Sequence, residues 1–424
     1  MSRRLPVLVL SLLLSLPLLA ADWPQFRGPN RDGVSPETSL LTRWPEGGPP
    51  VVWRAKGGKG YSGIVVSEGR VYTQWAEGEG EKGNEYAVAL DAATGKELWR
   101  FRTDSVYVDP SGNGDGPRAT PAVDGDRLFV MSGRGKLHAL DRKTGKLLWQ
   151  HDLAAMAGSV GAGGEGSFCS SPLVSGDRVF VEIGADKARR SNSSFAAFDK
   201  ATGKILWTVE NDTAGFSAPQ AVTLAGARQI LFFSASGLVA LAPEDGRVYW
   251  RHPWKTDYDV NAVLPVVLPG DRVFVSSGYD VGNALLQIAK SDQGFTVREV
   301  WKNRSFSSLF SSFILHGGHL YGFHKRIFKC VDPNTGEEKW KDDSFNIGNL
   351  VLAGTHLIVL NETGELGLVE ATPAAFKPVA RAKVLSGRTI TVPALADGRL
   401  YARNNTDEIV CLKLSDSTSG GTSR

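Results

Sequence analysis

The sequence is poor in residues on which many active sites depend. Its 424 residues include three cysteines, three methionines and seven histidines. Cys169, Cys330 and Cys411 are too few and too widely spaced for a disulfide scaffold; at most one pair can bridge, and we expect buried small side chains. The net charge of +3, with 22% charged residues, argues against a nucleic-acid-binding protein, which would carry a concentrated basic stripe. The P-loop and the G-x-S-x-G elbow are also missing, and we assign no catalytic residue.

Long apolar runs are missing everywhere except near the N-terminus. Arg3 and Arg4 precede an apolar run over 5–19, and two alanines follow it. This order predicts a cleaved signal peptide at 1–21. The run is short for a membrane span, and no later stretch is apolar enough to be one. We therefore expect an exported protein, periplasmic or secreted, without a lipid anchor, because no cysteine follows the cleavage site.

What the sequence does contain is a repeated phrase. Ala-Leu-Asp-x-x-Thr-Gly-Lys-x-Leu-Trp occupies 89–99 and 139–149, with close or looser copies at 197–207 and 331–340. A fixed repeat of this kind indicates an array of identical structural units. The tryptophans that mark the units lie 39 to 58 residues apart. They are Trp53, Trp99, Trp149, Trp207, Trp250, Trp301 and Trp340.

Each unit reads as four short strands joined by tight turns. Runs rich in Val, Ile, Leu and Phe alternate with Gly and Asp turns, which is the pattern of antiparallel hairpins. Four such strands make one propeller blade. Eight starts of inner strands can be counted, but the last unit has room for three strands, and 51–54 near the N-terminus supplies the fourth. We predict one all-β, eight-bladed propeller, closed by pairing of N- and C-terminal strands.

This interpretation divides the chain into four parts. The signal peptide at 1–21 is followed by an extension at 22–50 that packs on the propeller. The propeller spans 51–415, and a disordered tail spans 416–424. We expect a monomer.

The repeated residues have structural roles in this interpretation. Each Trp is expected to pack between adjacent blades, and the Asp and Gly of the phrase form the turn between third and fourth strands. These turn residues are Asp91, Asp141, Asp199, Gly95, Gly145 and Gly203.

The long connections between blades are the predicted site, because loops on a rigid scaffold commonly carry function. Arg118 stands directly before an inner strand and is either an anion or carbonyl clamp, or a structural Arg that bonds loop carbonyls or a neighbouring Asp. Asp259 and Asn261 hold a similar position. Phe168 and Tyr61 form stacking walls or plug the channel. These five residues are the candidate ligand site at the channel mouth.

Two local patterns suggest metals without completing a site. Residues 109–114 resemble the start of a calcium loop, but Thr120 stands where the bidentate Glu is expected. His316, His319 and His324 cluster around a Gly-Gly turn, with no Asp, Glu or Cys nearby to complete a zinc set. We assign no metal site.

The phrase resembles the repeat of the pyrroloquinoline-quinone (PQQ)-type propellers, a superfamily that includes quinoprotein alcohol dehydrogenases and the assembly factor BamB. Segments 23–33, 116–121 and 276–279 are similar to those of exported bacterial members. In the dehydrogenases the resemblance implies PQQ sandwiched between a Trp and a disulfide of adjacent cysteines, with calcium beside it. This chain has no adjacent cysteines and no such calcium motif, so we expect neither PQQ nor calcium.

Three functions remain open at this point. The leading hypothesis is a non-catalytic, BamB-like scaffold that binds envelope proteins. The second is a quinoprotein-type dehydrogenase that uses PQQ and calcium at the channel mouth. The third is a binder of a small ligand or carbohydrate at the same mouth.

Overall fold

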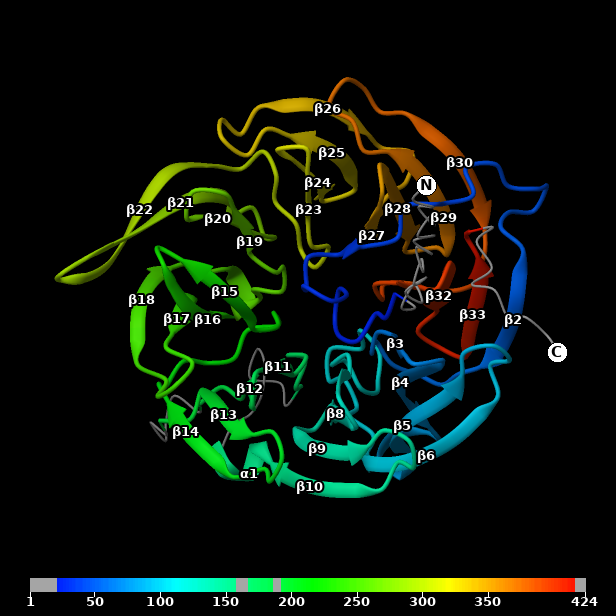
Figure 1. Ribbon diagram of the computed structural model, residues 1–424, viewed down its shortest axis with the longest axis horizontal. Coiled ribbons are helices and arrows are strands. Elements are labelled where there is room, and N and C mark those ends of the chain that lie inside the picture. The colour runs from blue at the N-terminus through cyan, green and yellow to red at the C-terminus, as the bar shows by residue number, and fades with distance from the viewer. Residues whose placement is uncertain (1–20, 158–166, 186–191, 416–424) are drawn as a thin grey trace, which may run out of the picture.

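Eight antiparallel sheets form a closed ring in the computed structural model, which describes residues 21–157, 167–185 and 192–415 (Figure 1). Each sheet contains one blade of four antiparallel strands, and one sheet gains a fifth, parallel strand from the N-terminal segment; the prediction of an all-β, eight-bladed propeller is confirmed. Residues 1–20 of the predicted signal peptide and the predicted tail at 416–424 lie outside the described residues. In the described parts of the chain, no helix has the length and apolarity needed to cross a membrane.

Blades 1 to 4 follow one another along the chain. Blades 1 and 2 consist of β3 (Val65–Ser67), β4 (Arg70–Glu77), β5 (Asn84–Asp91), β6 (Glu97–Ser105), β7 (Ala122–Asp124), β8 (Arg127–Met131), β9 (Lys136–Asp141) and β10 (Leu147–Asp152). Blades 3 and 4 consist of β11 (Leu173–Ser175), β12 (Arg178–Glu182), β13 (Phe195–Asp199), β14 (Ile205–Val209), β15 (Gln220–Leu224), β16 (Ala227–Ser234), β17 (Gly237–Leu241) and β18 (Val248–Pro253).

Blades 5 to 8 complete the ring. Blades 5 and 6 consist of β19 (Val266–Leu268), β20 (Arg272–Ser277), β21 (Gly282–Ser291), β22 (Gly294–Asn303), β23 (Ile314–His316), β24 (His319–His324), β25 (Ile327–Val331) and β26 (Glu338–Asp342). Blades 7 and 8 consist of β27 (Gly348–Ala353), β28 (His356–Asn361), β29 (Glu365–Glu370), β30 (Pro378–Lys383), β31 (Ala394–Ala396), β32 (Arg399–Arg403), β33 (Glu408–Lys413) and β2 (Val51–Lys56). The short helices are η1 (Gly80–Lys82), α1 (Leu153–Ala157) and η2 (Asp257–Asp259).

The two ends of the propeller pair with each other. Strand β2 lies antiparallel to β33, with Trp53 opposite Cys411. This pairing gives blade 8 its fourth strand, as the sequence predicts. Because the ring is closed, both faces of each blade are covered by neighbouring blades. The middle strands are therefore buried on both sides, as in 128–131 of β8.

The repeat tryptophans pack between blades, as predicted. Trp149 is 9% exposed, and its indole nitrogen donates to the carbonyl of Lys200 in the next blade at 3.2 Å. Gly203 of that turn has φ +75° and faces the indole so closely that a Cβ would lie 2.7 Å from Trp149 Cδ2. The glycine is therefore required both for its conformation and for space. Five further tryptophans reach a carbonyl of the following blade: Trp53, Trp99, Trp207, Trp301 and Trp340.

Blade 7 lacks the repeat Trp, and the sequence suggests Val384 and Leu385 as its replacement. The strand register corrects this, because Ala380 lies opposite Leu368, where other blades place the Trp. Val384 and Leu385 are buried just beyond β30.

A β-bulge precedes this register position in every outer strand. In blade 1, Leu90 pairs with Glu97 and Ala89 pairs with Trp99, so Leu98 is skipped. A bulge distorts an edge strand and protects it from pairing with another chain. The skipped residue points outward and is aliphatic in five consecutive blades, 7, 8, 1, 2 and 3. We call these residues the bulge row: Val379, Val52, Leu98, Leu148 and Leu206, which are 36 to 46% exposed.

The segment before the first blade crosses the middle of the ring, where Figure 1 shows it in dark blue. Trp23 forms a bridge with Val66 of blade 1, and β1 (Val34–Ser35) adds to β27 in parallel. Between these ends, Arg27 and Arg31 are 2% exposed. This part of the extension therefore lies inside the channel.

Carbonyl groups of residues directly before the inner strands hold both arginines. Arg27 donates to the carbonyls of Ser312 and Phe313, which lie directly before β23 of blade 6. Arg31 donates to Pro219 at 2.7 Å and also to Ser171 and Pro172. Burial lowers the pKa of Arg27 to about 10 and that of Arg31 to about 9, so both remain charged at neutral pH.

Candidate functional site

A cavity of about 640 Å³ opens at one mouth of the channel, where the loops run into the inner strands. Phe26 of the N-terminal segment is part of its lining. A second, smaller cavity of about 280 Å³ is lined by Arg27 and Arg31. The N-terminal segment thus contributes to both cavities, and the mouth is a pocket within a partly filled channel.

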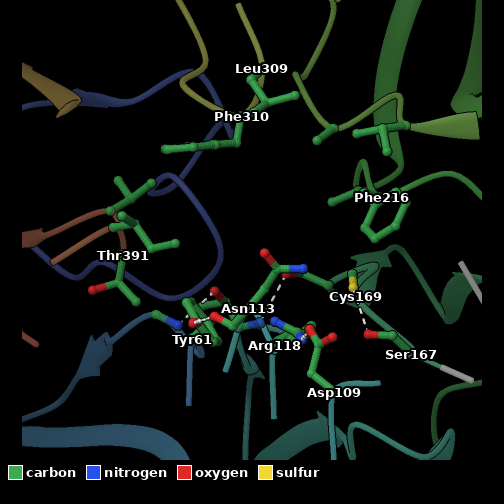
Figure 2. Close-up of a pocket in the computed structure, with 18 of the residues that line it drawn as sticks. Tyr61, Asp109, Asn113, Arg118, Ser167, Cys169, Phe216, Leu309, Phe310 and Thr391 are labelled. Carbon is green, nitrogen blue, oxygen red and sulfur yellow. Dashed lines mark hydrogen bonds and ion pairs between the residues drawn. The ribbon is translucent and has the colours of Figure 1, made fainter. Parts of the chain in front are cut away.

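Arg118 lies in one wall of this cavity, close to Tyr61 (Figure 2), and its guanidinium packs on two aromatic rings. Its guanidinium carbon is 4.9 Å from the centre of the Tyr61 ring and 5.2 Å from that of Tyr107. The same guanidinium forms an ion pair with Asp109 and donates to the carbonyl of Gly114 at 3.0 Å. The sequence left open a structural role for Arg118, in which it bonds loop carbonyls or a neighbouring Asp, and these are the contacts of that role. The same contacts fix the position of the Arg118 guanidinium, on which both tyrosine rings pack.

Apolar side chains form the side of the cavity that faces Arg118. Figure 2 shows Phe216, Leu309 and Phe310 there, across from Tyr61 and Asp109. They come from the loops in front of blades 4 and 6, directly before inner strands. One wall of the cavity is therefore polar and aromatic, and the opposite wall is apolar.

Two exposed tyrosines stand at the rim of the cavity. Tyr258 is 78% exposed and Tyr279 is 41% exposed, and their rings are 5.3 Å apart. Both have positive φ, 65° and 53°, as do Asp259 and Asp280 beside them. Non-glycine residues rarely adopt this conformation, and such strain tends to be found at functional sites.

Cys169 is the cysteine of the cavity. Its sulfur lies 3.1 Å from the hydroxyl oxygen of Ser167, as drawn in Figure 2. Burial raises the pKa of the Cys169 thiol, and the nearby charge of Arg118 offsets only part of this rise. The thiol is therefore protonated at neutral pH and is a weak nucleophile. All three cysteines are free.

The cavity brings together three of the five predicted site residues: Arg118, Tyr61 and Asp259. Phe168 is 3% exposed and packs in the core between blades 2 and 3, where its ring faces Gly135. Asn261 is fully buried; its amide donates to the carbonyls of Ser234 and Trp254. The predicted position of Phe168 and Asn261 in the lining is therefore corrected: both support the loops from behind.

The clustered histidines do not converge on one point. His316 and His319 flank the turn between β23 and β24, whereas Nδ1 of His324 accepts the backbone N–H of Ser307 at 2.9 Å. Within the described ranges, no three His, Cys, Asp or Glu side chains lie close enough to hold a metal ion.

Sequence reasoning missed several lining residues. Phe216, Phe310 and Thr391 each precede an inner strand by a few residues, as Arg118 does, so the repeat register contains the signal that would have found them. Phe26 carries no comparable signal, because its place depends on how the N-terminal segment enters the channel.

Comparison with known proteins agrees with this geometry. The family model described as "Outer membrane protein assembly factor BamB" matches residues 83–342. This chain belongs to that family. The BamB of Burkholderia pseudomallei is 25% identical over 373 residues, which cover 82% of this chain and 86% of that protein. The solved BamB of Moraxella catarrhalis superposes with a TM-score of 0.62 at 19% identity, covering 87% of this chain and 98% of that one.

A shorter likeness connects the same propeller to enzymes. The quinohemoprotein alcohol dehydrogenase ADH IIB of Pseudomonas putida is 34% identical over 132 residues. That match covers 30% of this chain and 18% of the enzyme. The resemblance to PQQ-type propellers, inferred from the repeated phrase, is thus confirmed at the level of the superfamily.

Proposed function

We propose that this chain is an exported, non-catalytic propeller that binds another protein of the cell envelope and acts in outer-membrane protein assembly. The observation that carries the proposal is the extent of the sequence likeness. The likeness to the assembly factor of Burkholderia pseudomallei covers 86% of that protein, whereas the likeness to the dehydrogenase covers 18% of the enzyme. What is shared with the enzyme is a stretch of repeats.

The bulge row is the surface that we propose for docking. Leu98, Leu148 and Leu206 are 46, 44 and 38% exposed and occupy one register position in three consecutive blades. Because the bulges disfavour addition of a partner strand, a partner would contact these side chains. Exposed apolar surface marks protein interaction sites when it is extensive, and we propose that the bulge row acts as such a surface.

The cavity residues do not fit PQQ with its calcium ion. The described residues that line the cavity include one cysteine, Cys169, and no tryptophan. Of the two carboxylates in the described lining, Asp109 and Asp259, the first is paired with Arg118 and is not free for a cation. We therefore propose that the chain works without PQQ or calcium. Stoichiometric PQQ binding with dye-coupled alcohol oxidation would contradict this.

Complementation of a deletion strain tests the docking proposal. Deletion of the gene from the source bacterium should lower the amounts of outer-membrane proteins, measured by quantitative mass spectrometry of the outer-membrane fraction. The wild-type chain should restore these amounts, and the triple variant L98S/L148S/L206S should not. Each of these residues is at least 38% exposed, so each substitution should cost less than about 1 kcal/mol of stability.

Val300→Ser is the matched control. Val300 has the same register position in blade 5 and is 38% exposed, but it stands outside the bulge row. It should complement fully. Full complementation by the triple variant would refute the docking surface, and unchanged outer-membrane proteins in the deletion strain would refute the assembly role.

A further inference from the structure

We propose that the cavity at the channel mouth binds an uncharged saccharide of one to a few sugar rings. The inference goes beyond the docking function, because it concerns the loops at the channel mouth, whereas the bulge row lies on the outer strands. It is carried by the shape of the cavity, the balance of its charges, the distribution of its aromatic and polar groups, and the strain at its rim.

The cavity has the size and shape of a small-ligand site. Its volume of about 640 Å³ lies within the usual range of ~300–1,000 Å³ for such sites. Phe26 contributes to its lining, and Arg27, the next residue, is anchored to the carbonyls of Ser312 and Phe313. The segment that fills the channel is therefore fixed to the scaffold, which favours a preformed pocket over one that a ligand must open.

The charges that line the cavity balance. Among the described lining residues, the charged ones are Asp109, Arg118, Asp259 and Arg388. Asp109 and Arg118 neutralise each other in an ion pair, and Asp259 and Arg388 add one formal charge of each sign, so the formal charges of the lining sum to zero. A lining with no net formal charge offers a charged ligand no net counter-charge for the hydration that it loses, so the site favours a neutral molecule.

The remaining groups match the two chemical sides of a sugar ring. The C–H faces of a sugar are apolar and stack on aromatic rings, which Tyr61, Phe216 and Phe310 offer from different walls. The hydroxyls at the edge of a sugar both donate and accept hydrogen bonds. Ser167 and Asn113 on the polar wall carry groups that do the same. A flat hydrocarbon would leave this polar wall unpaired, which is costly once water is excluded.

The rim tyrosines extend the aromatic surface out of the cavity. The rings of Tyr258 in η2 and of Tyr279 in the turn after β20 lie 5.3 Å apart, and each residue has a left-handed conformation that costs energy. Tyr258 gains no burial in return, because it is 78% exposed. A second sugar ring that leaves the cavity would stack on this pair and bury it.

Saturation-transfer NMR with uncharged trisaccharides tests the proposal. The probes are maltotriose, cellotriose and the trimer of N-acetylglucosamine, each mixed with the wild-type chain. We expect transfer from the aromatic protons of the protein to at least one probe. In the variant Y258A/Y279A the affinity for that probe should fall about tenfold, which corresponds to about 1.4 kcal/mol.

Tyr249→Ala is the matched control. Tyr249 also belongs to an aromatic pair, 4.7 Å from Phe295, but lies on the outer strand of blade 4. It should leave saccharide binding unchanged. Circular dichroism melting identifies any variant that fails to fold, and Tyr279→Ala alone then replaces the double variant.

Three outcomes would overturn the proposal. Absence of transfer to all three probes would remove its basis, and equal binding by Y258A/Y279A would place the sugar elsewhere. Tighter binding of glucose 6-phosphate than of glucose would contradict the neutral site. None of these outcomes bears on complementation by the bulge-row variants, so failure here is distinguishable from failure of the docking function.

Discussion

The packing of a repeat Trp against the glycine of the next blade gives a quantitative prediction. Trp149→Ala removes a side chain that is 9% exposed and that packs beside Phe198 with ring centres 6.3 Å apart. Losses of this kind are about 3–5 kcal/mol. Gly203→Ala places a methyl group 2.7 Å from Trp149 Cδ2 at φ +75°. The left-handed conformation costs ~1–2 kcal/mol, and overpacking adds about 1–3 kcal/mol.

The two costs should not add. In the double variant W149A/G203A the indole is gone, so the methyl group added at position 203 no longer clashes and only its backbone cost remains. We expect the double variant to be about 2 kcal/mol more stable than the sum of the two single changes predicts. The physical reason is that each single variant disrupts the same contact, that of the Trp149 indole with Gly203, so the sum of the two single costs includes this contact twice.

Urea unfolding of the wild type and the three variants, followed by tryptophan fluorescence and circular dichroism, measures this coupling. Coincident transitions by the two probes are required for a two-state treatment. Gly125→Ala is the control: its φ is +58° and a Cβ would meet nothing within 4 Å, so it should show the backbone cost without coupling to Trp149. Additivity within about 0.5 kcal/mol would refute the proposed packing.

Three further predictions follow from buried groups and from the closing strand. Arg31→Met should lower the free energy of unfolding by about 2 kcal/mol because it orphans the carbonyls that Arg31 binds, whereas Arg43→Met, at an exposed position, should have no effect in the same urea assay. Burial raises the pKa of Glu85 from 4.5 to about 7, so the native state binds this proton more tightly than the unfolded state does. The free energy of unfolding should therefore fall, by at most about 3 kcal/mol, as the pH rises from about 4.5 to 7. Glu85→Gln should flatten this fall, and an unchanged pH profile in that variant would contradict the prediction. A chain that starts at residue 57 lacks both β2 and the segment in the channel and should aggregate in size-exclusion chromatography, whereas a chain that starts at residue 22 keeps both and should elute as a monomer.

Much of the fold could be predicted because its signals are local and repeated. The Asp91 side chain accepts hydrogen bonds from the backbone of Ala93 and Thr94, so the turn follows from three neighbouring residues. The missing fourth strand of the last unit pointed to 51–54, and β2 indeed completes that blade. Blade 7 was harder, since the position of Ala380 depends on a bulge that a single strand does not reveal.

The candidate site was only partly predictable. Arg118 and Tyr61 were found because they lie directly before inner strands, but Phe168 and Asn261 share that neighbourhood and face away from the cavity. Sequence position alone does not say which way a loop side chain turns. A contact that decides it comes from another element, as in the bond of Asn261 to Ser234 in β16 of blade 4.

The sequence by itself determined the number of blades, the turns that join their strands, the tryptophans between them and the strand that closes the ring. These depend on residues a few positions apart and on a register repeated along the chain. Only the tertiary structure decided that the N-terminal segment fills the channel, that Arg27 and Arg31 bond carbonyls of distant blades, and that polar and apolar walls meet at the mouth. Those arrangements join residues more than a hundred positions apart, and their geometry exists only once the ring has closed.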